Sequence, residues 1–317
     1  MCSAGPPRRL RIVALHGWGT NGSAFSAKIG ALRTELKHEA DFFFPDGPIE
    51  LSQPPLSVPP PLHPRGGDQP LDTVGTRSDG LASAAALPPV SSSSSPVPLS
   101  QRTASLVPVA PGGRSWYDFS RLETGESATY DGIDACFTAL AAYCDALVAE
   151  GGPLDGVIGF SQGAVVAAIW VARRATLPRS MEIRFAGFVS GLLPTAPELR
   201  GEVRTALSRS VAPPRVPHVG AVAGAESTST PPLRFATFHV LGETDSIIEP
   251  RRSLDLAEAC LLPGSSTGED GGVSTSSRSA VWDHGNVFRH PGGHVVPSSC
   301  RKFVKSFLAK NGAPASN

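Results

Sequence analysis

The sequence predicts an α/β protein in which a mostly parallel sheet is covered by helices on both faces. Short apolar runs such as Leu10–Leu15 alternate with longer runs whose apolar residues recur at helical spacing. Short buried strands joined by amphipathic helices are typical of βαβ units. Hydrophobic residues make up 40% of the 317 residues, which is enough for a buried core.

The first elements of the chain are a predicted strand, helix and strand. The strand at Leu10–Leu15 runs into a glycine-rich turn that begins at His16. Ser23 is the expected N-cap of the helix that follows, because serine oxygens accept hydrogen bonds from the first N–H groups of a helix. The second strand is expected near residues 41–44. The apolar stripe of the helix consists of Phe25, Ile29, Leu32 and Leu36.

Three segments differ in composition from the rest of the chain. Residues 51–112 are dominated by Pro, Ser, Gly and Ala and contain no Phe, Trp or Tyr, so they can bury little apolar surface against the entropy of ordering. We expect a disordered insertion there, and favour a solvated spacer over a docking or regulatory tail. Residues 201–232 and 263–280 have the same character. We therefore predict one domain over residues 1–317, interrupted by these insertions, with roughly 200 ordered residues.

The second half of the chain continues the alternation of helices and strands. A long helix is expected to end at Gly151 and Gly152, since glycine commonly follows a helix C-terminus. Ser298 or Ser299 is expected to cap a terminal helix. The other expected elements are strands at 183–189, 235–241 and 286–290 and a helix at 253–262.

Charge and cysteine content exclude several classes of function. The chain has 28 Lys and Arg against 28 Asp and Glu, without a basic block, which argues against binding to nucleic acid or to a membrane surface. Five scattered cysteines without a Cys-x-x-Cys pair favour a reducing compartment over disulfides or a zinc site. Cys136 and Cys144 fall on an apolar helix stripe and are interpreted as packing residues. Without a membrane span or a signal-type segment, we expect a cytoplasmic protein.

The most informative motif is Gly-Phe-Ser-Gln-Gly at residues 159–163. A bare G-x-S-x-G occurs by chance in glycine-rich chains, but here a strand-like run precedes it and a helix-like run follows. At such a turn the serine has strained backbone, and the flanking glycines let neighbouring elements pass closely. We interpret Ser161 as a catalytic nucleophile, with the Gln162 backbone N–H as a donor to an oxyanion at the helix N-terminus.

A serine nucleophile needs a base that is held by a third group. Reactive groups gather at the carboxyl ends of parallel strands, where Asp245 follows the penultimate predicted strand and His294 follows the last. The order Ser161, Asp245, His294 is that of the α/β-hydrolase arrangement. Glu243 stays open as an alternative acid. His290 stays open as an alternative base, although the flexible Gly-Gly before His294 favours the latter.

The turn after the first strand supplies a further candidate group. The run His-Gly-Trp-Gly-Thr-Asn-Gly at residues 16–22 lacks the lysine of a phosphate loop and the G-x-G-x-x-G spacing, so it does not indicate a nucleotide site. The Trp18 backbone N–H could be the second oxyanion donor. His16 is interpreted as a residue that braces the loop by hydrogen bonds, and not as a base.

Six motifs occur in an order that resembles the FSH serine hydrolase family. They are Leu15-His16-Gly17, Phe44-Pro45-Asp46, Arg114-Ser115-Trp116-Tyr117, the run from Gly156 to Ala164, Ser190-Gly191 and Gly292-Gly293-His294. This family includes the ovarian-cancer-associated esterase and fungal thioesterases of polyketide pathways, and the chain is more distantly similar to acyl-protein thioesterases. The resemblance covers most of the chain outside the insertions. Residues 51–112, and Tyr117 where many members have a second Trp, depart from the pattern.

The resemblance implies an α/β-hydrolase fold with Ser161 as nucleophile, Asp245 as acid and His294 as base. Backbone N–H groups of Trp18 and Gln162 would form the oxyanion hole. We expect a carboxylesterase that cleaves medium- to long-chain acyl esters through an acyl-enzyme. It would require no metal and no organic cofactor, and its partner would be a small-molecule substrate.

Two other functions stay open from the sequence. The first alternative is a thioesterase acting on acyl-CoA or acyl-carrier substrates, because esters and thioesters pass through similar tetrahedral oxyanions. An alternative of another class is a catalytically weak, hydrolase-like interaction scaffold that binds partners through its Ser/Pro insertion. The sequence carries no signal for an oligomeric state.

Overall fold

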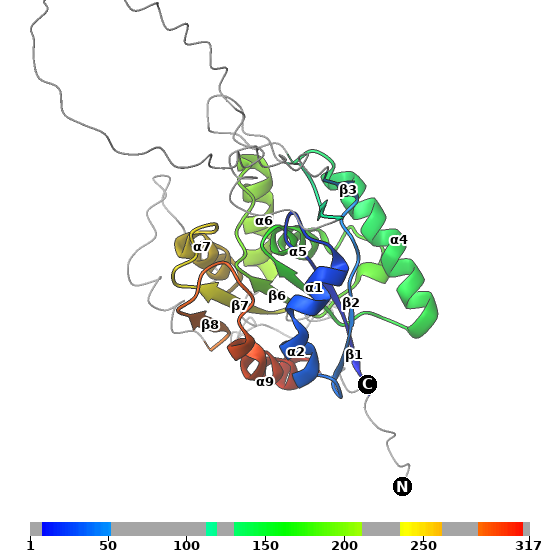
Figure 1. Cartoon of the computed structure of the whole chain (residues 1–317). Helices are drawn as coiled ribbons and strands as arrows, with labels where there is room; N and C mark the ends of the chain where they lie inside the picture. Colours follow the sequence, from blue (N-terminus) through cyan, green and yellow to red (C-terminus); the bar gives the residue numbers. More distant parts are fainter. Residues whose placement is uncertain (1–7, 52–111, 119–129, 211–234, 262–284, 313–317) are drawn as a thin grey trace, which may run out of the picture.

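The computed structural model describes residues 8–51, 112–118, 130–210, 235–261 and 285–312. Within these residues a six-stranded sheet has the order β2-β1-β5-β6-β7-β8, and all its neighbouring strands are parallel (Figure 1). The predicted α/β class is confirmed. The strands are β1 (Leu10–Leu15), β2 (Ala40–Phe43), β5 (Gly156–Phe160), β6 (Phe185–Val189), β7 (Ala236–Gly242) and β8 (Val287–His290).

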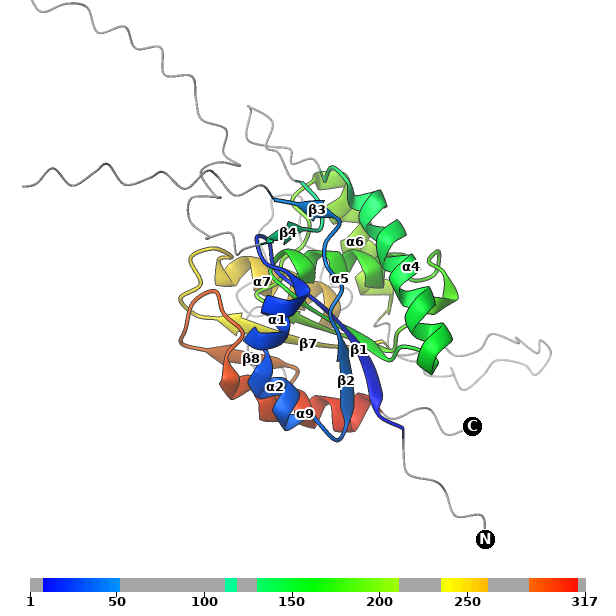
Figure 2. The ribbon, with the colours of Figure 1, turned by 45° about the vertical axis from the view of Figure 1, so that its right-hand side comes forward.

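Helices cover both faces of the sheet (Figure 2). Successive strand residues point to opposite faces, so Ile12 and Ala14 pack into one core and Val13 and Leu15 into the other. The core of Ile12 is covered by α1 (Gly22–Lys28), α2 (Gly30–Glu35) and α9 (Arg301–Asn311). The core of Val13 is covered by α4 (Ile133–Gly151), α5 (Gln162–Arg173), α6 (Pro197–Ser210) and α7 (Pro250–Leu261).

Two predicted helix caps are wrong. The side chain of Asn21, and not that of Ser23, caps α1 by accepting a hydrogen bond from the Ala24 N–H at 2.8 Å. Neither Ser298 nor Ser299 is the N-cap of α9, because a 3₁₀ turn over Ser298–Cys300 runs directly into that helix. Helix α9 therefore continues this turn and does not begin at a serine side-chain cap.

The predicted insertion at 201–232 is wrong for its first ten residues. Residues 201–210 form the greater part of α6, and Val203 and Leu207 are buried. The polar composition of the segment gave no sign of this helix. Two apolar residues four positions apart are nevertheless enough to pack one face of a helix against the core. Residues 211–232 and the predicted insertion at 263–280 lie outside the described residues.

The ends of the insertion at 51–112 lie side by side in the structure. The short strands β3 (Ile49–Glu50) and β4 (Arg114–Ser115) pair antiparallel, and the Leu51 N–H donates to the Gly113 carbonyl at 2.9 Å. Residues 52–111 lie outside the described residues. The chain therefore leaves the fold and returns to it at one place. That place adjoins the turn after β1, because the Arg114 N–H donates to the Thr20 carbonyl at 2.7 Å.

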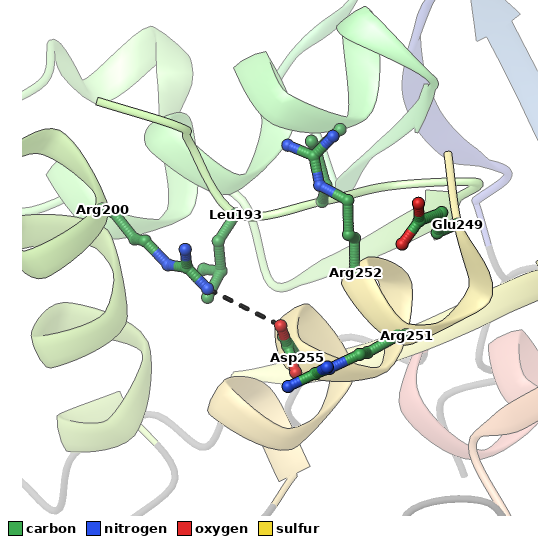
Figure 3. Close-up of a pocket in the computed structure, with 7 residues that line it drawn as sticks. Leu193, Arg200, Glu249, Arg251, Arg252 and Asp255 are labelled. Atoms are coloured by element: carbon green, nitrogen blue, oxygen red, sulfur yellow. Dashed lines mark ion pairs between the residues drawn. The ribbon is translucent and has the colours of Figure 1, made fainter. Parts of the chain in front are cut away.

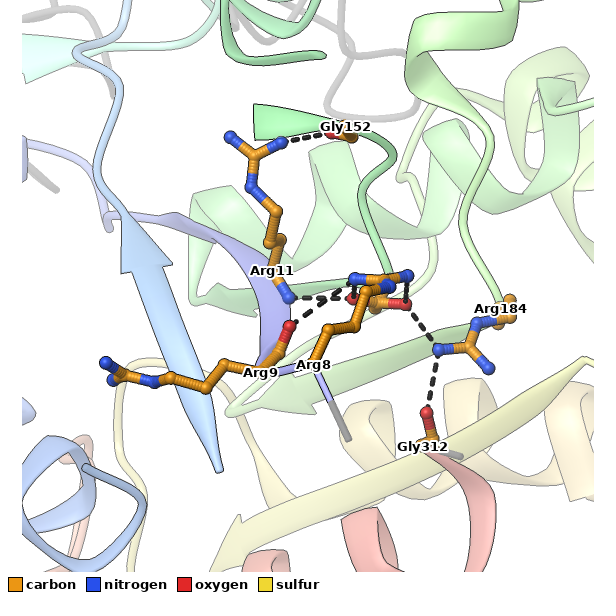
Figure 4. A network of polar contacts seen from close by, with 7 residues as sticks. Arg8, Arg9, Arg11, Gly152, Arg184 and Gly312 are labelled. Atoms are coloured by element: carbon orange, nitrogen blue, oxygen red, sulfur yellow. Dashed lines mark hydrogen bonds and ion pairs between the residues drawn. The ribbon is translucent and has the colours of Figure 1, made fainter. Parts of the chain in front are cut away.

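A buried carboxylate organises the amino ends of the central strands (Figure 4). Asp155 precedes β5, and its side chain has no exposed surface. It accepts two hydrogen bonds of 2.7 Å from the Arg8 guanidinium, one of 2.8 Å from the Arg11 backbone N–H, and one from Arg184. Arg184 also donates to the Gly312 carbonyl at 2.7 Å, so the network joins β1, β5 and β6 to the end of α9.

Candidate active site

Ser161 lies at a sharp turn between β5 and α5. Its φ of 54° is in the left-handed region, which non-glycine residues rarely adopt. The glycines on either side are explained by the collisions that a Cβ atom would make there. A Cβ on Gly159 would collide with the Gly163 carbonyl, and one on Gly163 would collide with the Leu15 carbonyl. The G-x-S-x-G pattern is therefore required by the close passage of β1, β5 and α5.

An acid–base pair forms at the ends of β7 and β8. His294 Nδ1 donates to Asp245 Oδ2 at 2.8 Å, and Asp245 Oδ1 accepts from the N–H groups of Ile247 and Ile248 at 3.0 and 2.9 Å. Burial alone would raise the pKa of Asp245, but the hydrogen bonds from His294 and Ile248 outweigh it and hold the pKa below its usual value. The carboxylate therefore stays ionised at neutral pH, and it fixes the imidazole with Nε2 free to accept a proton.

The loops that carry this pair are joined to each other. The Glu243 N–H donates to the His290 carbonyl at 2.9 Å, and Thr244 Oγ1 donates to the Pro291 carbonyl at 3.0 Å. A Cβ on Gly242 would collide with the Gly293 carbonyl, so the histidine turn packs directly on the end of β7. The relative position of acid and base is thus fixed by backbone contacts.

The imidazole lies beside the nucleophile elbow. The ring of His294 packs on Phe160, the residue before Ser161, with the two ring centroids 4.8 Å apart. In the described part of the chain, no hydrogen bond joins Ser161 Oγ to His294. Such bonds are often open without substrate and tighten in the Michaelis complex.

The two alternative site residues have other surroundings. His290 is buried, and its Nδ1 accepts a hydrogen bond from the Gly292 N–H at 3.2 Å. Burial lowers the pKa of His290. Glu243 is about half exposed and lies 3.9 Å from Arg289. The structure brings together Asp245 and His294 and leaves Glu243 outside this pair.

The turn after β1 passes next to Ser161. A Cβ on Gly17 would lie 3.3 Å from Ser161 Cβ. His16 braces this turn as predicted, since its Nδ1 hydrogen-bonds the Gly17 carbonyl at 2.8 Å and its Nε2 accepts from the Gly47 N–H at 3.0 Å. The Trp116 indole N–H donates to the His16 carbonyl at 2.7 Å. Burial lowers the pKa of His16, which keeps the imidazole neutral.

The two predicted oxyanion donors are backbone N–H groups of the turn after β1 and of the start of α5. Trp18 follows Gly17, and its N–H makes no backbone hydrogen bond within the described residues. Gln162 is the first residue of α5, so its N–H has no partner inside the helix. Both N–H groups therefore stay candidate donors to an oxyanion.

The side chain of Gln162 has a role that sequence reasoning missed. It is buried, and its Oε1 accepts from the Trp116 N–H at 3.1 Å while its Nε2 donates to the Tyr117 carbonyl at 2.7 Å and to Ser115 Oγ at 2.9 Å. The amide thus ties the segment that follows the long insertion to the nucleophile elbow. A polar residue at a position next to a nucleophile, in an otherwise apolar helix, is the only sequence signal for this tether.

The four described cysteines are not candidate nucleophiles. All four are buried, and burial raises the pKa of Cys136, Cys144 and Cys260 to about 12 and that of Cys300 to about 11. A thiol reacts as its thiolate, so these groups are inert at neutral pH. The interpretation of Cys136 and Cys144 as packing residues is confirmed by their burial in the core.

A comparison with protein families decides the membership of the chain. The model of a family described as serine hydrolase (FSH1) matches residues 6–67 and 81–267, which is well over half of the chain. The chain belongs to the FSH1 serine hydrolase family. It is a hydrolase, and the family resemblance read from its motifs is confirmed.

Relatives of this FSH1 hydrolase include an uncharacterized hydrolase of Schizosaccharomyces pombe, which is 30% identical over 80% of this chain. The chain spans only 44% of the length of that protein. Esterase OVCA2 of Xenopus tropicalis is 26% identical over 97% of this chain and 95% of its own. Human esterase OVCA2 is 27% identical over 92% of this chain and 91% of its own.

Several solved structures resemble this chain at low sequence identity. Maize acyl-protein thioesterase 2 matches with a TM-score of 0.49 and 17% identity, covering 98% of this chain and 96% of its own. A Bacillus cereus carboxylesterase matches with a TM-score of 0.45 and 14% identity, covering 96% of this chain and 89% of its own. None of the helices in the described ranges has the length and apolarity needed to span a bilayer.

Proposed function

We propose that this hydrolase cleaves carboxylic esters with Ser161 as nucleophile, His294 as general base and Asp245 as the acid that orients the base. The observation that carries the proposal is the 2.8 Å hydrogen bond from His294 Nδ1 to Asp245, made by a ring that packs on the residue before a left-handed Ser161. This arrangement can turn an alcohol oxygen into a nucleophile at neutral pH.

The first half-reaction forms an acyl-enzyme. His294 Nε2 takes the proton of the Ser161 hydroxyl while the oxygen attacks the ester carbonyl carbon. The carbonyl oxygen becomes an oxyanion, which the N–H groups of Trp18 and Gln162 stabilise; one such donor is worth about 10²–10³ in rate. The imidazolium then gives its proton to the leaving alkoxide, and the ester C–O bond breaks. Asp245 stays ionised throughout and stabilises the imidazolium.

The second half-reaction releases the acid. A water gives one proton to His294 Nε2 and attacks the acyl carbon, and the same N–H groups stabilise the second oxyanion. Collapse of this intermediate returns the proton to Ser161 and frees the carboxylic acid. The two halves together consume one water and need no metal or organic cofactor.

We propose medium to long acyl chains as the preferred substrates. Two partly buried apolar side chains, Ile247 and Ile248, follow Asp245 after one intervening residue at this edge of the sheet. Apolar surface of this kind would favour longer chains by about 0.8 kcal/mol for each buried methylene. The esterase names of relatives that match over almost their full length support ester substrates.

A substrate panel tests the proposal. Wild type and Ser161→Ala are to be assayed on p-nitrophenyl esters from acetyl to palmitoyl and on the matching acyl-CoAs. We expect kcat/KM for the esters to rise from acetyl to the medium-chain members and to be lost in Ser161→Ala. Turnover of acyl-CoAs alone would instead support the thioesterase alternative. No turnover of any substrate would support the interaction scaffold and contradict the proposal.

A further inference from the structure

A cavity of about 370 Å³ is lined by residues of α6, of α7 and of the loops that precede these helices (Figure 3). It lies where α6 and α7 begin, and it shares loops with the proposed triad. The N–H of Ile248 donates to the Asp245 carboxylate, and Glu249 of the cavity follows directly. The cavity is lined by Leu192, Leu193, Arg200, Glu249, Arg251, Arg252 and Asp255.

Three arginines line this cavity at helix positions where a positive charge is unfavourable. Arg200 lies in the first turn of α6, and Arg251 and Arg252 lie in the first turn of α7. The N-terminal end of a helix is itself positive, so cations there are unfavourable for helix stability. Two carboxylates offset part of this charge: Asp255 lies 3.6 Å from Arg200, and Glu249 is exposed. Among the described residues that line the cavity, three carry a guanidinium and two carry a carboxylate.

We propose that this cavity binds an anionic group of the substrate, a phosphate or a carboxylate, and that Arg200 and Arg251 select for it. This inference rests on the proposed function, because it places the anion on a molecule whose acyl carbon meets Ser161. The volume suits part of a small molecule. Guanidinium groups are suited to both anions, since they can donate two parallel hydrogen bonds. The anion would come from a phosphate-bearing leaving group such as CoA or from a terminal carboxylate of the acyl chain.

Matched substrates and variants test the anion site. Octanoyl-CoA and monomethyl suberate carry the anion on the leaving group and on the acyl chain, and methyl octanoate is the neutral reference. In Arg251→Ala and Arg200→Ala we expect kcat/KM to fall about 10-fold or more for one of the two anionic substrates. We expect less than about a 2-fold change for methyl octanoate. Arg179→Ala, at an exposed site outside the cavity, is the control and should change none of them.

A binding measurement keeps this test independent of turnover. CoA and suberate are to be titrated into Ser161→Ala by calorimetry, with and without Arg251→Ala. Binding of either anion that weakens about 10-fold with Arg251→Ala supports the site. Absence of binding by both, or equal losses for neutral and anionic substrates, overturns it. Failure of the proposed function would appear differently, as wild type that does not cleave methyl octanoate.

A second inference concerns Ser190, which follows β6 as Ser161 follows β5. These two serines are the non-glycine residues with positive φ in the described part of the chain, at 45° and 54°. The last residues of their strands, Val189 and Phe160, are partners in the sheet register. The Ser161 N–H donates to the Val189 carbonyl at 3.0 Å, and the Ser190 N–H to the Val240 carbonyl at 2.9 Å. Ser190 therefore lies between the strand of the nucleophile and the strand of the acid.

The hydroxyl of Ser190 is buried, and Oγ has no hydrogen-bond partner of normal geometry among the described residues. Glycine would adopt this φ with less strain, and a buried hydroxyl without a partner is unfavourable. The Asp245 carboxylate can accept one more hydrogen bond. It can accept about four hydrogen bonds, and three come from Ile247, Ile248 and His294. The Ser190 hydroxyl is also near enough to help lower the pKa of Asp245.

We infer that Ser190 is a positioning residue whose hydroxyl donates the fourth hydrogen bond to the Asp245 carboxylate. With substrate bound, this hydrogen bond would hold the Asp245 carboxylate in the orientation in which it accepts from His294. This inference also rests on the proposed function, but it uses none of the observations that support the anion cavity.

Ser190→Gly removes the hydroxyl and relieves the backbone strain, so the variant should fold. We expect kcat to fall about 10-fold with KM within about 2-fold. The acidic limb of the kcat/KM profile should move to higher pH, because a carboxylate with one donor fewer holds a proton on the imidazole more strongly. Ser253→Ala is the matched control: its buried hydroxyl donates to the Gly191 carbonyl at 2.7 Å, outside the acid's contacts.

The control should lose stability without moving the pH profile. A wild-type kcat and an unmoved acidic limb in Ser190→Gly would overturn the role of Ser190. The proton resonance of His294 Nδ1–H gives a second readout, which should shift in Ser190→Gly and not in Ser253→Ala. Loss of the proposed function itself would show as absent turnover in all of these proteins, including the wild type.

Discussion

The two ends of β5 show opposite designs. Asp155 at the amino end accepts hydrogen bonds from the Arg8 and Arg184 guanidiniums and the Arg11 N–H, so this buried carboxylate is fully satisfied (Figure 4). At the carboxyl end, Ser161 has left-handed backbone and Ser190 has a buried hydroxyl without a normal partner. Complete pairing stabilises one end of the strand. Strained backbone and polar groups without hydrogen-bond partners, as at the other end, are typical of a reactive site.

The two buried carboxylates sharpen this contrast. Asp155 pairs with the guanidiniums of Arg8 and Arg184, which take no part in the proposed reaction. Asp245 pairs with the imidazole of His294, the proposed general base. The first carboxylate is therefore expected to matter for stability and the second for activity. The following predictions test that division.

Replacing the proposed base should have the largest effect. His294→Ala is expected to lower kcat by about 10⁴–10⁶, because the serine proton loses its acceptor. His290→Ala is the matched variant and should cost far less in kcat. Equal losses in kcat for the two variants would make His290 the base instead.

Asp245→Asn should lower kcat by about 10⁴, because the amide would favour the wrong tautomer of His294. The fold should survive, since the amide oxygen can still accept the backbone N–H groups of Ile247 and Ile248. Steady-state kinetics and thermal unfolding measure the two effects. A fall in kcat below about 10-fold would contradict the acid role of Asp245.

Asp155→Ala should give the reverse result. It leaves two guanidiniums and the Arg11 N–H without their acceptor, so we expect a loss of about 3–5 kcal/mol in the free energy of unfolding. The kcat of the folded fraction should be unchanged. Asp41→Ala breaks an exposed pair with Arg9 and should cost at most about 1 kcal/mol. Urea unfolding followed by circular dichroism compares the two variants.

Gln162→Ala should lower both stability and activity. It leaves the Trp116 N–H buried without its acceptor, at about 1–3 kcal/mol, and removes one donor to the Tyr117 carbonyl, which still accepts from Ser115 Oγ. KM should rise, because the segment after the insertion is no longer tied to the elbow. Gln162→Glu, which keeps the oxygen but loses the donor to Tyr117, should fall between wild type and Gln162→Ala. Wild-type KM in both variants would show that the tether is dispensable.

The smallest expected effect is a pH dependence of stability. Because burial lowers the pKa of His16 in the folded protein, below about pH 6.5 the unfolded chain binds a proton that the folded chain does not. Stability should therefore fall with decreasing pH, by at most about 1.4 kcal/mol per pH unit for this group. His16→Gln should flatten the curve, and His38→Gln, at an exposed site, should not. If stability depended on pH equally in both variants, His16 would not be the buried, neutral group that causes this dependence.

The sequence predicted those parts of the molecule that depend on local pattern. Alternating apolar runs gave the strands, and the glycines around Ser161 mark a turn that collides with any Cβ. Caps and helix starts were less predictable, because Asn21 and Ser23 are equally good cap residues and only tertiary packing selects one. The helix at Pro197–Ser210 was missed since its composition is polar apart from one buried stripe.

Contacts between distant segments were the least predictable part of the site. Gln162 and Tyr117 are 45 residues apart, and the role of the amide appears only once the chain has folded. Ser190 gave no chemical signal of its own in the sequence, because its significance lies in a left-handed φ and in burial next to an acid. Asp245 and His294 could be predicted, since the carboxyl ends of parallel strands meet at one edge of a sheet.

Covalent labelling by a fluorophosphonate tests the central claim most directly. Intact-mass analysis of wild type should show one adduct, and peptide mapping should place it on Ser161. Ser161→Ala should take up no label at the same concentration, and His294→Ala should label far more slowly than wild type. Labelling of Ser161→Ala at the wild-type rate, or a wild-type protein that stays unlabelled, would contradict the account of this site.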